Sequence, residues 1–169
     1  MAGWSEQEIE LGEVKLHLWR GGRGRSVLVL HHDIGTPDRL PFYDALADKF
    51  DVIVPRHPGF GVPERPQWMR HPRDIASLYQ WLLADLGIER ASLVGLGFGG
   101  WVAAEMAALA PRDFHRLVLV GAMGVKPPEG DILDQLSAAP AYRLFVRRSS
   151  ARWLTEWLID AALEFSVAP

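Results

Sequence analysis

The sequence predicts an α/β domain with a doubly wound, mostly parallel sheet. Four short segments have apolar centres, as strands buried on both faces of a parallel sheet do: residues 26–31, 51–54, 91–94 and 117–120. Helix-like segments separate these strands, and buried strands that alternate with helices specify a doubly wound α/β fold. Polar and apolar residues alternate over residues 13–19, which predicts an antiparallel strand at the start and therefore a mixed sheet.

Three segments between these strands predict helices. Residues 39–50 follow the first buried strand, and residues 101–110 are rich in small side chains and end at Pro111. Residues 71–86 place apolar side chains on one stripe at helical spacing, and Gly87 then ends the helix as a C-cap glycine. The helices and strands together account for the chain up to about the fourth strand.

The residue pattern of the chain changes after Gly124. A proline- and glycine-containing loop follows, and no seventh or eighth strand can be placed before the chain reaches Pro169. Residues 151–165 predict an amphipathic helix, with one apolar face made by Leu154, Trp157, Leu158, Ala161 and Phe165. We therefore divide the chain into a core of residues 1–125, incomplete at its C-terminal side, and a cap-like or truncated helical tail of residues 126–169.

The composition excludes several classes of function. A formal net charge of −3, from 18 basic and 21 acidic side chains, creates no strong field for phosphate backbones or anionic lipid, so we expect neither nucleic acid nor a membrane as a partner. The absence of cysteine removes thiolate nucleophiles and thiolate metal sites. We expect no metal and no cofactor. The first 11 residues do not resemble a secretory signal, and we expect a cytoplasmic protein.

The sharpest motif is the run VGLGFGG at residues 94–100, where a buried strand turns directly into a helix. In this context it resembles the nucleophile elbow of the α/β-hydrolase superfamily, Gly-x-Ser-x-Gly. Two further segments agree with the resemblance, which runs from residue 10 to residue 125. Residues 32–35 (HDIG) are similar to the family's His-Gly-x-Gly oxyanion loop, and residues 55–61 (PRHPGFG) are similar to its Pro-Asp-x-Pro-Gly-x-Gly loop.

The resemblance implies that Gly97 stands at the position of the catalytic nucleophile. A side chain at this position is held at positive φ above the sheet, at a cost of about 1–3 kcal/mol that serves a purpose only if the side chain reacts. Glycine removes the strain and the reactive atom together. The resemblance also implies that the amides of Ile34 and Phe98 form an oxyanion hole, and that the triad acid and histidine would lie beyond Pro169. We therefore expect a relative of hydrolases of small ester or carbonyl substrates that does not itself carry out serine hydrolysis.

His32, Asp33 and Trp68 are the candidates for lining a small-molecule pocket. Asp33 stands where the family usually has glycine, and Trp68 lies in a loop. His31 and His32 cannot both reach one site, because neighbouring residues on a strand point to opposite faces. Hydrogen bonding to the adjacent loop is the simpler role for these histidines.

Two other functions stay open at this point. The chain could be a non-catalytic module of the same fold that binds a small molecule or a protein partner. Gly95, Gly97 and Gly100 also satisfy the dinucleotide fingerprint Gly-x-Gly-x-x-Gly, although the strand at 117–120 is not followed by the acidic residue that this fingerprint requires.

The order of strands in the superfamily predicts an open sheet edge. The strand at residues 117–120 would be covered there by a seventh strand, and without one it presents unpaired backbone groups to solvent. We predict that the terminal helix, a second copy of the chain in a homodimer, or a complementing chain covers this edge.

Overall fold

The computed structural model describes residues 3–33, 35–36, 40–60, 65–124 and 144–146. Four strands correspond to the predicted buried segments: β3 (Ser26–Leu30), β4 (Asp51–Pro55), β5 (Ala91–Leu96) and β6 (Phe114–Val120). Three more lie outside them: β1 (Trp4–Leu11), β2 (Val14–Gly22) and β7 (Leu144–Val146).

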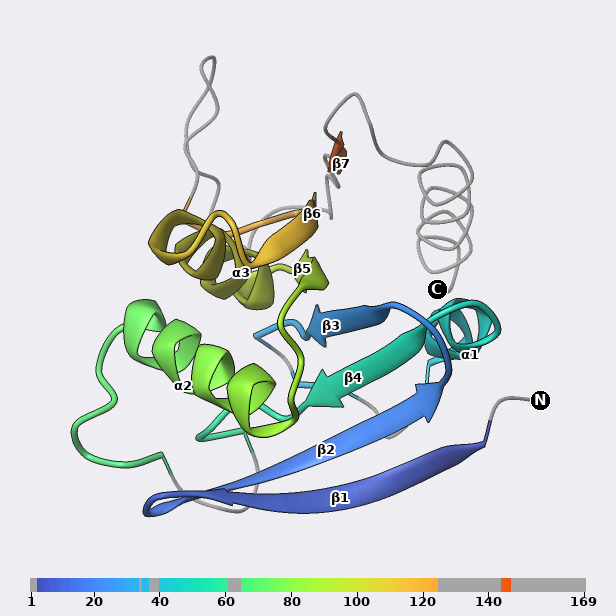
Figure 1. Ribbon diagram of the computed structural model, residues 1–169. Helices are drawn as coiled ribbons and strands as arrows, with labels where there is room; N and C mark the ends of the chain where they lie inside the picture. The colour runs from blue at the N-terminus through green and yellow to red at the C-terminus, as the bar shows by residue number, and fades with distance from the viewer. Residues whose placement is uncertain (1–2, 34, 37–39, 61–64, 125–143, 147–169) are drawn as a thin grey trace, which may run out of the picture.

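These strands form one seven-stranded sheet with the order β1-β2-β4-β3-β5-β6-β7 (Figure 1). The four central strands are parallel to one another. β2 runs antiparallel to β4, and β1 and β7 are antiparallel to their neighbours. The predicted mixed sheet with a parallel centre is therefore confirmed.

The sequence-based prediction missed β1, which pairs with β2 over its whole length. The signal was present as alternation: Glu6, Glu8 and Glu10 are exposed, whereas Ile9 is partly buried and Leu11 is buried. Charged side chains on an edge strand also discourage pairing with other chains, so they suit this position.

The three predicted helices are present, with shifted ends: α1 (Pro41–Ala47), α2 (Pro72–Asp85) and α3 (Phe98–Leu109). α2 begins at a capping box, in which the His71 ring accepts a hydrogen bond from the Arg73 amide and the Asp74 carboxylate accepts one from the His71 amide. α3 begins at residue 98 rather than 101, because the last two glycines of the motif belong to the helix and not to the turn. Among the described residues, none of the helices could span a membrane.

Two apolar layers cover the two faces of the sheet, since successive residues of a strand point to opposite sides. α2 and α3 pack on one face, against Leu28, Leu30, Ile53 and Leu93. α1 packs on the other face, with Val27, Val29, Val52, Val54, Val94 and Val118. Figure 1 shows α1 at the far side of the sheet from α2 and α3. The helices cover the two faces of the sheet, and the loops that follow the central strands lie at the carboxyl ends of those strands.

The prediction that no strand follows residue 120 is wrong. β7 pairs antiparallel with Val118–Val120, so this part of the β6 edge is covered by the same chain. A short segment of three residues carries little periodicity, which is why the sequence did not reveal it. The predicted helix over residues 151–165 and the division at residue 125 fall on segments outside the described residues.

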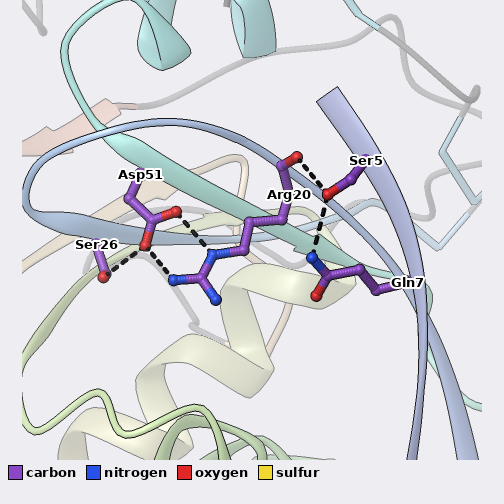
Figure 2. Close-up of polar contacts among 5 residues, drawn as sticks. All are labelled: Ser5, Gln7, Arg20, Ser26 and Asp51. Carbon is purple, nitrogen blue, oxygen red and sulfur yellow. Dashed lines mark hydrogen bonds and ion pairs between the residues drawn. The ribbon is translucent and has the colours of Figure 1, made fainter. Parts of the chain in front are cut away.

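An ion pair joins the antiparallel and parallel parts of the sheet (Figure 2). The Arg20 guanidinium on β2 donates from Nε to Oδ1 of Asp51 at 2.9 Å and from Nη2 to Oδ2 at 2.8 Å. The hydroxyl of Ser26, at the start of β3, donates to the same carboxylate at 3.0 Å. Asp51 is only 8% exposed, so this carboxylate holds three strands together from a buried position.

Asp51→Ala is expected to lower the free energy of unfolding by about 1–3 kcal/mol, because it leaves the donors of Arg20 and Ser26 without their acceptor. Asp48→Ala is the matched control. Asp48 is exposed, and its removal should change stability by no more than about 0.5 kcal/mol. Urea denaturation measures both variants, and equal stabilities would contradict this role for Asp51.

Candidate active site at the β5–α3 turn

Gly97 forms the turn between β5 and α3, with φ of +51° and ψ of −116°. Three hydrogen bonds of 3.0 Å fix its backbone: its amide donates to the Val120 carbonyl, and its carbonyl accepts from the amides of Gly100 and Met123. A side chain held in such a conformation would cost about 1–3 kcal/mol. The elbow backbone is therefore present, and the residue at its tip has no side chain.

The other glycines of the motif have steric reasons that involve no nucleotide. A Cβ on Gly95 would lie 2.5 Å from the Gly100 Cα, so these two glycines let α3 pack directly on β5. A Cβ on Gly99 would collide with the backbone of Leu30 in β3. Close packing of the helix on two strands thus accounts for the glycine spacing, which favours the elbow interpretation over the dinucleotide fingerprint.

The ring of His32 fills the space above Gly97. A Cβ built on Gly97 would lie 2.6 Å from the His32 Nδ1 and 2.7 Å from its Cε1, too close for both to be present. Gly97 is buried, whereas the His32 side chain is 32% exposed. The side chain displayed at the tip of the elbow therefore comes from the loop after β3.

Asp33 fixes the tautomer of this imidazole. The His32 Nδ1 lies 2.9 Å from the Asp33 Oδ1. An ionised carboxylate only accepts hydrogen bonds, so Nδ1 carries the proton and donates it, and Nε2 of the neutral ring holds the lone pair. No group among the described residues makes a hydrogen bond to this Nε2. The Gly35 amide closes the loop by donating to the His32 carbonyl at 3.1 Å.

A buried polar trio, His31, His57 and Tyr79, supports the loop from beneath. The His57 amide donates to the His31 Nε2 at 2.9 Å, and the His57 Nε2 lies 2.9 Å from the His31 carbonyl. The Tyr79 hydroxyl lies 2.6 Å from the His57 Nδ1, and the His31 Nδ1 lies 2.6 Å from the His32 carbonyl. Both histidines are 1% exposed and Tyr79 is fully buried.

Only one arrangement of protons on neutral rings satisfies all of these contacts. The His31 Nε2 accepts, so its Nδ1 is the donor to the His32 carbonyl. A carbonyl cannot donate, so the His57 Nε2–H donates to the His31 carbonyl oxygen. The His57 Nδ1 then accepts from the Tyr79 hydroxyl. Burial lowers the pKa of His31 to about 4, and burial together with the nearby His31 lowers the pKa of His57 well below its usual range. Both imidazoles are therefore neutral.

The trio confirms hydrogen bonding to the loop as the role of His31 and was otherwise not predicted. His57 lay within the PRHPGFG motif, and Tyr79 belonged to an apolar helix stripe. A histidine next to a proline–glycine turn was the available signal for a buried polar contact. The pairing with a tyrosine on α2 could not be read from the sequence.

The structure brings together three of the predicted site residues with the elbow and separates a fourth. His32, Asp33 and Phe98 lie at Gly97. Phe98 is the first residue of α3; its amide makes no hydrogen bond to a described residue, and its ring lies 5.5 Å from that of His57. Trp68 is 48% exposed and donates to Glu13 in the β1–β2 turn, away from the elbow. Ile34 lies outside the described residues.

The fold and the elbow define the class of protein. The alpha/beta hydrolase fold family matches residues 27–159, and the chain belongs to this family.

The chain is similar to two curated proteins named 2-hydroxymuconate semialdehyde hydrolase. The one from Pseudomonas sp. (strain CF600) is 41% identical over 136 residues, which cover 76% of this chain and 47% of that protein. The one from Pseudomonas putida is 36% identical over 136 residues, which cover 72% and 45%. The chain spans about half the length of these relatives. A crystal structure of a membrane phospholipase A, a bacterial virulence factor, has a TM-score of 0.68 at 27% identity and covers 76% of this chain and 43% of its own.

Gly97→Ser is expected to destabilise the protein for two reasons. Serine adds strain at positive φ, and it displaces the His32 ring. The strain alone is worth about 1–3 kcal/mol. His32→Gly in the same chain should relieve the collision, so the two changes should be non-additive by about 1 kcal/mol or more. Chemical denaturation of the two single variants and the double variant measures this coupling.

Gly87→Ser is the matched control for that cycle. Gly87 has φ of +68°, and a Cβ there meets nothing within 4 Å, so the serine adds strain without a collision. Its effect should simply add to that of His32→Gly. Additive behaviour at Gly97 as well would show that the ring of His32 does not occupy the space above the elbow.

The neutral imidazoles predict a loss of stability in mild acid. The unfolded chain binds protons on His31 and His57 below the ordinary pKa of 6.5, and the folded protein does not. Stability that is fully present above pH 6.5 is therefore lost as the pH falls toward about 4, and His31 alone contributes roughly 3 kcal/mol of this loss. Urea unfolding at pH 7 and at pH 5 measures the larger part of this loss, about 2 kcal/mol for His31. The exposed His115→Gln should retain the loss, and a free energy of unfolding that is equal at the two pH values would contradict the neutral pair.

Proposed function

We propose that the chain binds a small ester or carbonyl compound at the β5–α3 turn and forms no acyl-enzyme there. The observation that carries the proposal is the geometry at residue 97. Gly97 has the backbone of a nucleophile elbow, and the ring of His32 stands where the reactive side chain would be. The chain is thus a family member that does not act as a serine hydrolase through this elbow.

Two observations support the class of ligand: the names of the relatives and the position of the first amide of α3. The two curated relatives are named as hydrolases of a semialdehyde, which is a small carbonyl compound. The amide of Phe98 is the first of α3, where helix N–H groups and the helix dipole favour negative charge on an oxygen atom. This amide follows directly on Gly97, the residue whose Cβ position the His32 ring occupies.

A second copy or a complementing chain at the outer edge of β6 remains a separate proposal. β7 pairs with Val118–Val120, and the described residues place no strand beside Phe114–Leu117 on that side. Light scattering over a range of concentrations tests it. A monomer at every concentration would remove the second copy.

The binding proposal predicts selective NMR shifts with a ligand that cannot be hydrolysed. Acetophenone should shift the amide signals of Gly35, Gly97 and Phe98 more than those of the β1–β2 hairpin. A fluorophosphonate probe should leave the intact mass of the chain unchanged, because no serine stands at the elbow. Stoichiometric labelling, or ketone-induced shifts confined to residues remote from the turn, would contradict the proposal.

A further inference from the structure

The His32 imidazole at the elbow is held by a carboxylate through Nδ1, and its Nε2 has no hydrogen-bond partner among the described residues. We propose that His32, oriented by Asp33, is a general base that activates water for attack on the ester or carbonyl compound bound at this turn. This inference rests on the proposed binding function and adds the residue that would carry out the chemistry. It replaces attack by a side chain of the elbow with attack by water.

The hydrogen bonds of His32 leave one ring nitrogen for this role. Nδ1 is committed to the Asp33 carboxylate at 2.9 Å, which fixes the ring orientation and places the lone pair on Nε2. The same carboxylate stabilises the imidazolium that forms when Nε2 takes a proton. The side chain is one-third exposed, so water can reach it, and no described residue bonds to Nε2.

Gly97 is what allows the ring to stand at this position. Any Cβ at residue 97 would lie within 2.7 Å of two atoms of the His32 ring. The glycine therefore does more than remove a nucleophile, because it opens the space into which the base is placed. The position of the His32 ring therefore requires glycine at residue 97.

The position of the His32 backbone is itself controlled. Its carbonyl oxygen accepts hydrogen bonds from the His31 ring at 2.6 Å and from the Gly35 amide at 3.1 Å. His31 is held in turn by the buried His57 and Tyr79. A base fixed in this way loses little conformational freedom when a substrate binds. The entropic cost of reaching the geometry for proton transfer is therefore low.

The reaction that this geometry supports is direct hydrolysis of an ester. The oxygen of a water molecule bonds to the carbonyl carbon while the His32 Nε2 takes one of its protons, and the carbonyl electron pair moves to the oxygen at the Phe98 amide. When the tetrahedral species collapses, the bond from carbon to the leaving alkoxide breaks. The imidazolium returns its proton to that alkoxide, so the products are the acid and the alcohol and His32 is neutral again.

The test measures phenol release from phenyl acetate and other phenyl esters of short acids. His32→Ala should lower kcat by about 10²-fold or more, the usual contribution of a general base. The change leaves a ring-sized hole above Gly97, so added imidazole should restore part of the lost rate in this variant, after the rate of imidazole without protein is subtracted. His115→Ala, at an exposed position, should have the activity of the unchanged chain and gain nothing from imidazole.

Asp33 is assigned as a positioning residue, and its test separates kcat from KM. Asp33→Asn should lower kcat about 10-fold or more with little change in KM, because the ring loses its orienting acceptor while the binding site remains. A change in KM alone would overturn the orienting role. A merely structural role for His32 would not give rescue by imidazole.

The remaining outcomes distinguish this inference from the proposed function. If acetophenone binds at the turn but no ester in the series is hydrolysed faster than by His32→Ala, the base is overturned and the binding function stands. If peptide mapping by mass spectrometry during turnover finds an acyl group on His32, the histidine is a nucleophile and not a general base, and the proposal that no acyl-enzyme forms at the turn fails with it. If no ligand binds at the turn, the proposed function itself fails.

Discussion

The backbone of Gly97 is held from three directions, by Val120 at the end of β6, by Gly100 in the first turn of α3 and by Met123 in the loop beyond β6. These bonds keep φ at +51°, a value that L side chains rarely adopt. Any residue at this position would project its side chain above the carboxyl ends of the parallel strands. The rest of the site depends on this constraint, because it creates the space that His32 enters.

Hydrogen bonds hold the loop that carries His32, as they hold the elbow. Its support is a chain of buried hydrogen bonds that runs from Tyr79 on α2 through His57 and His31 to the His32 carbonyl. Buried polar groups are costly unless each finds its partner, and here every donor is matched with an acceptor. The network therefore specifies one arrangement of three segments that are distant in sequence. It also makes the geometry above Gly97 dependent on two neutral imidazoles.

The sequence was sufficient for the centre of the fold and insufficient for the site. Runs such as Val27–Leu30 predicted the parallel strands, because burial on both faces leaves no polar position. The glycine motif predicted the elbow, and the positive φ of Gly97 agrees with that prediction. β1 and β7 were not predicted, because β1 has few apolar residues among its polar and charged ones and β7 has only three residues. The contact between His32 and Gly97 joins two residues far apart in the chain, and no local pattern encodes it.

The measurement that bears most directly on this account is the nuclear Overhauser effect between the His32 Hε1 proton and the Hα protons of Gly97. A ring seated above the elbow should give a strong cross-peak, and the ring current should displace the Gly97 Hα signals from the positions they take in His32→Ala. If the cross-peak is missing and the Gly97 signals are the same in both proteins, the imidazole does not occupy the place of the nucleophile.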